Sequence, residues 1–268
     1  MRRIGRLRFV DVPPPVAAAQ RPTGTLVLLH GFPLSPAMWE PQHALSERGW
    51  RIVIPELRGF GDGAQDPPTT SIDDYAGDTI DLLDALHVEQ AVIAGLSMGG
   101  YIAFALFRHA PRYFRGLVLA DTRAEPDPPA AVEGRKRMQQ MTRDRGQQAV
   151  ADELIPKLVA EATMRSNPEV AQRLRQMILD NSVDSIVGAL TALMTRPDSG
   201  PTLSGIHCPT LVIVGQADAL TPPSFSEAMC RAIGGAELAV VPSAGHMSNM
   251  EQPVVFNDAL ARFLDHRV

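Results

Sequence analysis

One serine of the chain lies where a nucleophile could be presented. Ser97 stands in the segment G-L-S-M-G at 95–99, which directly follows the apolar run 91–94 and opens a helical pattern. A strand-to-helix turn of this kind exposes the hydroxyl at a helix N-terminus, where developing negative charge is favoured. The turn is strained, and the small neighbours Gly95 and Gly99 can accommodate it. The segment therefore predicts Ser97 as a nucleophile.

A serine hydroxyl is a poor nucleophile unless a base takes its proton and an acid orients that base. Asp218 follows the apolar run 210–214, and His246 lies in the loop after the run 238–241. Residues that follow parallel strands converge at one edge of the sheet, although they are far apart in sequence. The chain order serine, aspartate, histidine predicts His246 as the base and Asp218 as its orienting acid.

Asp121 competes with Asp218 for the acid role, because it also ends an apolar run, 117–120. Its alternative interpretation is a helix N-cap or a turn partner at the start of the segment that follows. The sequence favours Asp218 and keeps Asp121 as the alternative.

The loop after the apolar run 26–29 reads H-G-F-P at 30–33. A tetrahedral oxyanion formed on Ser97 needs two N–H donors, one from the residue after the nucleophile and one from this loop. We therefore predict the backbone amides of Met98 and Phe32 as an oxyanion hole. His30 is interpreted as a structural hydrogen-bonding residue and not as a base.

The elements that must position these residues follow a regular alternation. Short apolar runs at 26–29, 51–54, 91–94, 117–120, 210–214 and 238–241 are separated by helix-length segments. Such runs are typical of strands that are buried on both faces of a parallel sheet. The chain is therefore predicted to form a doubly wound, mostly parallel α/β sheet, with an antiparallel edge strand near 7–12.

The alternation breaks once, between the runs 117–120 and 210–214. Helical patterns near 131–143, 147–159, 168–180 and 183–195 fill this stretch, and turn-rich segments bound it. We predict a helical cap at 125–200, inserted after the sixth strand, and a core formed by 1–124 and 201–268. Five of the eleven methionines fall in the cap, either as the core of a helical layer or as an apolar ceiling for a ligand.

Apolar substrate contacts are expected beside the nucleophile. The candidates are Phe32, Trp39 and Met247, because ligand cavities are lined mainly by apolar and aromatic side chains. A core position is the alternative interpretation for Trp39.

Composition excludes several classes of protein. Thirty acidic residues against 25 basic ones give a net charge of −5, which argues against a nucleic-acid partner. Two cysteines exclude a disulfide scaffold and match no metal pattern. No apolar run has the length of about 18 residues that a membrane span needs. Asp11 and the prolines 13–15 interrupt the signal-peptide pattern that the alanine-rich run 16–19 suggests. We expect a cytoplasmic protein without a metal or an organic cofactor.

These motifs together resemble the α/β-hydrolase superfamily over nearly the whole chain, in the branch with a serine nucleophile. Haloalkane dehalogenases and epoxide hydrolases are similar in outline but have aspartate where this chain has Ser97. Segments 119–122, 218–223 and 246–253 look like those of 3-oxoadipate enol-lactonases and small carboxylesterases. Glu56 and Gly63 depart from the aspartate and serine usual in that group, which weakens the subfamily placement.

The resemblance implies hydrolysis of a small-molecule carboxylic ester or lactone through an acyl-serine. Three alternatives share the fold: a cofactor-free haloperoxidase or perhydrolase, for which Pro33 makes peracid formation a side reaction, a carbon–carbon bond hydrolase, and a ligand receptor without turnover. The natural substrate, the pathway and the oligomeric state are left open.

An anionic substrate such as an enol-lactone needs a cation near the site. The basic residues that could supply it are Arg135, Lys136, Arg137, Arg143 and Arg145. A solvated helix face is the simpler interpretation of this run.

Overall fold

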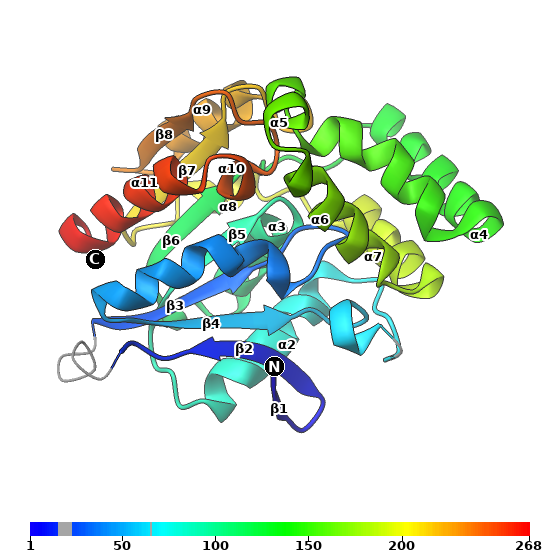
Figure 1. Ribbon diagram of the computed structural model, residues 1–268. Coiled ribbons are helices and arrows are strands. Elements are labelled where there is room, and N and C mark those ends of the chain that lie inside the picture. The colour runs from blue at the N-terminus through cyan, green and yellow to red at the C-terminus, as the bar shows by residue number, and fades with distance from the viewer. Residues whose placement is uncertain (16–22, 65) are drawn as a thin grey trace.

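A computed structural model describes residues 1–15, 23–64 and 66–268 (Figure 1). Its centre is an eight-stranded sheet with the order β1-β2-β4-β3-β5-β6-β7-β8. β3 to β8 pair in parallel, while β1 and β2 pair antiparallel at one edge. The predicted α/β sheet is confirmed. The strand predicted near 7–12 is antiparallel as expected, but it does not lie at the edge, because β1 pairs with its outer side. The alanine-rich run 16–19 lies outside the described residues.

The bounds of the elements agree closely with the sequence pattern. The strands are β1 (Arg2–Ile4), β2 (Leu7–Val12), β3 (Gly24–Leu29), β4 (Trp50–Glu56), β5 (Ala91–Leu96), β6 (Phe114–Ala120), β7 (Thr210–Gly215) and β8 (Glu237–Val241). The helices outside the cap are η1 (Pro36–Arg48), η2 (Gly61–Gly63), α2 (Ile72–Ala85), α3 (Met98–His109), η3 (Pro111–Tyr113), α8 (Gly200–Leu203), α9 (Pro223–Ala232), α10 (Ser248–Glu251) and α11 (Pro253–His266).

Both faces of the sheet are buried along its central strands, and successive side chains of each strand point to opposite faces. Leu26 and Leu28 of β3 face a cluster that includes side chains of η1 and α11. Val27 and Leu29 face the opposite cluster, to which α2, α3 and α9 contribute. This two-sided burial explains why the central strands read as continuous apolar runs, whereas the edge strand β8 exposes Leu238 and Val240.

Residues 125–200, which we call the helical insertion, follow β6 as predicted. They contain α4 (Pro129–Leu158), α5 (Glu161–Ser166), α6 (Pro168–Leu179) and α7 (Val183–Thr195), and α4 packs against α6 and α7 (Figure 1). Gly146 has a φ of 72° and breaks α4, in agreement with the two helices predicted there. The division of the chain into a core and a separate cap stays a prediction.

Among the described residues, no single helix is long and apolar enough to cross a membrane. α6 and α7 reach that length only together, as a pair bent by 100°.

Two glycines let the backbones of β3, β5 and α3 approach one another. A Cβ atom on Gly95 would lie 2.2 Å from the carbonyl oxygen of Gly99. A Cβ atom on Gly99 would lie 2.1 Å from the carbonyl oxygen of Leu29. Since both neighbours are backbone atoms, no side-chain rotation can make room, and glycine is required at both positions.

We predict that Gly99→Ala lowers the free energy of unfolding by about 3 kcal/mol, because the methyl group overpacks a site that only a backbone shift could relieve. Urea denaturation measures the change. Gly77→Ala in α2 is the matched control, since nothing lies within 4 Å of its Cβ position. There alanine should raise stability by up to about 1 kcal/mol. Equal effects of the two substitutions would contradict the requirement for glycine at 99.

Candidate active site

Ser97 occupies the turn between β5 and α3 in the conformation that its motif predicts. Its φ of 55° and ψ of −114° lie in a region that non-glycine residues rarely adopt. The Ser97 N–H donates to the carbonyl of Ala120 over 3.0 Å, and Thr122 Oγ1 donates to the Ser97 carbonyl over 2.9 Å. The end of β6 therefore holds the strained turn in place, and strain of this kind is concentrated at functional sites.

His246 and Asp218 form a buried pair at the same edge of the sheet. His246 Nδ1 lies 2.8 Å from Asp218 Oδ2. The other oxygen, Asp218 Oδ1, accepts the N–H groups of Leu220 and Thr221 over 2.9 and 3.0 Å. Thr221 Oγ1 donates to Oδ2 over 2.6 Å. The carboxylate is therefore fixed by its own loop and oriented toward the imidazole.

Each member of the pair shifts the pKa of the other in the direction that favours the charged form. Burial by itself raises the pKa of Asp218, but the charge of His246 and the hydrogen bonds from His246 and Thr221 lower it below its ordinary value. Burial lowers the pKa of His246, but the charge and hydrogen bond of Asp218 outweigh it and raise that pKa above its ordinary 6.5. The environment thus stabilises the protonated, imidazolium form of His246.

Asp121 lies nearby in a different network. It is fully buried, and Oδ1 accepts the Gly215 N–H over 2.7 Å while Oδ2 accepts the Ser248 hydroxyl. No hydrogen bond joins Asp121 to His246 in the described part of the chain. Burial and the charge of Asp218 raise the pKa of Asp121 well above its ordinary value. Asp121 thus fits the alternative of a turn partner, since it joins the ends of β6 and β7 to α10.

The loop after β3 lies beside Ser97, because a Cβ atom on Gly31 would be 3.5 Å from the Ser97 Cβ. Within residues 1–15, 23–64 and 66–268, the N–H groups of Phe32 and Met98 find no hydrogen-bond acceptor. His30 accepts the Leu57 N–H at Nε2 over 3.1 Å, so its Nδ1–H faces the Gly31 carbonyl at 3.1 Å. Complete burial lowers the pKa of His30 to about 4. His30 is therefore a neutral structural residue, as predicted.

A cavity of about 820 Å³ joins these groups to the helical insertion. Ser97, His246 and Phe32 line it from the core, and the insertion contributes Met138 and Met141. These two methionines fit the interpretation as an apolar ceiling. Met177, by contrast, is buried in the core.

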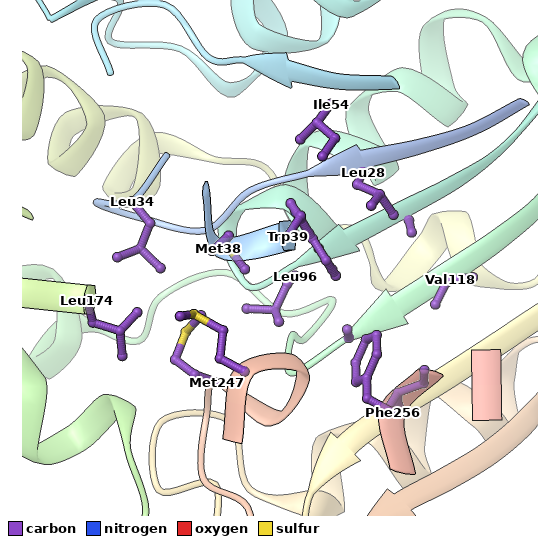
Figure 2. Packing of buried hydrophobic residues seen from close by; sticks show 14 of the residues in the cluster. Leu28, Leu34, Met38, Trp39, Ile54, Leu96, Val118, Leu174, Met247 and Phe256 are labelled. Carbon is purple, nitrogen blue, oxygen red and sulfur yellow. The ribbon is translucent and has the colours of Figure 1, made fainter. Parts of the chain in front are cut away.

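Two predicted substrate contacts are wrong. Neither Trp39 nor Met247 is among the residues that line this cavity, and both belong to the buried core. Figure 2 shows Trp39 and Met247 among the packed side chains of the cluster. The Trp39 ring packs against Phe256 with a centroid distance of 6.1 Å. Trp39 and Met247 are therefore core residues and do not face the cavity.

Comparison with known proteins agrees with this geometry. Residues 26–259 match the model of the alpha/beta hydrolase family. The chain belongs to this family. It is 29% identical to 3-oxoadipate enol-lactonase 2 of Acinetobacter baylyi over 242 residues, which are 90% of this chain and 88% of that protein.

Two solved structures are similar to this alpha/beta hydrolase over 97% of its length. A thermophilic esterase from Thermogutta terrifontis, solved with malate bound, has a TM-score of 0.90 and 39% identity, with 93% of its chain covered. The enol-lactonase from Burkholderia xenovorans has a TM-score of 0.87 and 26% identity, with 96% covered.

The segment 246–253, which resembles that of enol-lactonases, anchors the histidine loop of this hydrolase on three sides. Ser248 donates to Asp121, and Asn249 Nδ2 donates to the Met38 carbonyl over 2.8 Å. Glu251 Oε1 accepts the Gly245 N–H over 2.8 Å. Its Oε2 accepts the N–H of residue 160, between α4 and α5, over 2.9 Å. Glu251 thus ties the loop that carries His246 to the helical insertion, a role that the sequence analysis missed.

We predict that Glu251→Gln destabilises the protein by about 2 kcal/mol. In the wild type both carboxylate oxygens accept backbone N–H groups, whereas glutamine replaces one oxygen with an NH₂ group that cannot accept a hydrogen bond. Chemical denaturation measures the loss. Glu227→Gln is the matched control, since Glu227 is half-exposed and lies 3.8 Å from Arg231. Its effect should stay within about 0.5 kcal/mol. If Glu251→Gln were equally mild, the carboxylate would not anchor the loop.

Proposed function

We propose that the protein hydrolyses carboxylic esters or lactones through an acyl-Ser97 intermediate. The observation that carries the proposal is that Ser97, on its strained turn, and His246, paired with Asp218, line one cavity. The relatives named for enol-lactone and ester hydrolysis support the same reaction.

In this mechanism His246 takes the proton of Ser97 as the hydroxyl attacks the carbonyl carbon. Asp218 holds the imidazole with Nδ1 toward its own carboxylate, so that Nε2 is the basic nitrogen. The amides of Phe32 and Met98 stabilise the tetrahedral oxyanion, with each donor contributing roughly 3 kcal/mol. The imidazolium then protonates the leaving group. Water hydrolyses the acyl-serine with His246 again as the base.

We predict that Asp218→Asn lowers kcat for 4-nitrophenyl acetate by about 10³-fold or more, because the imidazole loses its orienting carboxylate. Asp121→Asn should retain activity within about tenfold, since asparagine still accepts the Gly215 N–H. Steady-state kinetics measure both, and Ser97→Ala sets the background rate. Near-normal turnover in Asp218→Asn would transfer the orienting role to Asp121.

The rate should also depend on pH through His246. As a base it must be neutral, so kcat/KM falls when the pH drops through its pKa, which lies above 6.5 in the folded protein. We predict that the acid limb of kcat/KM has its midpoint above pH 6.5 and moves to lower pH in Asp218→Asn, where the carboxylate that stabilises the imidazolium is lost. A pH-rate profile measures both midpoints. An unshifted midpoint in the variant would argue against this charge coupling.

A further inference from the structure

The cavity at Ser97 is basic, although the chain as a whole is acidic. Its basic lining residues are Arg123, Arg135, Arg137, Arg145 and Lys157. Its acidic lining residues are Asp127, Asp144 and Glu153. The chain carries a net charge of −5, so this positive excess is a local feature of the cavity wall.

Within this wall, one carboxylate is shared by three arginines. The Asp127 side chain is fully buried and pairs with Arg123, Arg135 and Arg196. Burial raises the pKa of Asp127, but the arginines lower it below its ordinary value, so the carboxylate is ionised. Arginine does not lose its proton in proteins. The cluster therefore keeps an excess of positive charge that no acidic partner within it neutralises.

Arg196 anchors the cluster from behind. It is almost inaccessible, donates to the carbonyls of Leu193 and Glu125, and stacks over the ring of Tyr101 at 4.2 Å. Arg196 does not line the cavity. Its charge contributes to the local field, while its Nη1 and Nη2 groups donate to carbonyls of the protein.

Arg123 and Arg135 face the cavity with unused donors. Arg135 binds Asp127 through Nε and Nη2, and Arg123 binds it through Nη2. The Nη1 groups of both have no acceptor in the described part of the chain. Asp127 thus fixes two guanidinium groups while leaving N–H donors free for a ligand.

The cluster lies close to the nucleophile. Thr122, the residue before Arg123, donates its hydroxyl to the Ser97 carbonyl. Tyr101, beneath Arg196, donates its N–H to the same carbonyl over 3.4 Å and also lines the cavity. An ester held at Ser97 therefore has part of its structure within reach of this wall.

We propose that Arg123 and Arg135 form a carboxylate subsite, so that the preferred substrate is an ester or lactone that carries a carboxylate group. The guanidinium fork matches a planar carboxylate, which can accept two parallel N–H groups. Hydrolysis of such a substrate rests on the proposed function, whereas binding of a carboxylate at Arg123 and Arg135 does not. Lys136 and Arg143 do not line the cavity, so the solvated helix face explains only part of the basic run.

The kinetic test compares mono-4-nitrophenyl adipate with the neutral 4-nitrophenyl heptanoate. We expect the wild-type kcat/KM to favour the charged ester, and this preference to fall about tenfold or more in Arg123→Gln and in Arg135→Gln. Arg135→Lys keeps the charge but loses the fork, so its preference should be intermediate. Arg143→Gln removes the same charge outside the cavity and should keep the wild-type preference. An unchanged preference in both Arg123→Gln and Arg135→Gln would overturn the subsite.

A binding test separates this inference from the reaction. Calorimetry measures the Kd of monomethyl adipate for Ser97→Ala with and without Arg135→Gln, and we expect binding about tenfold weaker in the double variant. Equal Kd values would overturn the subsite even if the wild type hydrolyses both esters. If the wild type hydrolyses neither ester above the Ser97→Ala background, the proposed function fails, and the Kd comparison alone decides on the subsite.

Discussion

The turn at Ser97 depends on a close approach of the backbones of β3, β5 and α3, which is possible only where the residues carry no Cβ atom. Gly99 lies against the Leu29 carbonyl of β3, and Gly95 lies against the Gly99 carbonyl. This approach lets α3 begin directly after β5, with Ser97 at a positive φ in the turn between them. The hydrogen bonds from β6 then hold that conformation. Moving any of these strands would release the strain that presents the hydroxyl.

The same sheet edge brings two buried carboxylates together. Asp121 follows β6 and Asp218 lies just past β7, and these strands are neighbours in parallel register. Two like charges this close oppose each other, and the protein resolves the conflict by giving them different partners. Asp218 faces an imidazole that can become positive, whereas Asp121 faces a hydroxyl and an amide. Asp218 is therefore the counter-ion of a protonated His246, and Asp121 supports the ends of β6 and β7.

Sequence reasoning succeeded where the constraint is local or follows from strand order. The G-L-S-M-G segment describes a turn that few residues can form, and Asp218 and His246 were placed by the rule that parallel strands end at one edge. It failed for Trp39 and Met247, because an aromatic or methionine side chain suits a core and a ligand wall equally well. Which one it lines depends on the packing of distant elements. The role of Glu251 was hidden for the same reason, since its partner at residue 160 is 91 positions away.

The helical insertion does more than cover the cavity. Its first helix supplies Arg135 and the methionine ceiling, while its end at residue 160 is bound by Glu251 to the loop that carries His246. The Met247 N–H also donates to the Leu158 carbonyl of α4 over 3.1 Å. The cavity wall and the loop that carries His246 are thus joined by buried hydrogen bonds. A change in how α4 packs would therefore alter the cavity and the position of His246 together. In the proposed mechanism this couples substrate selection to the geometry of proton transfer.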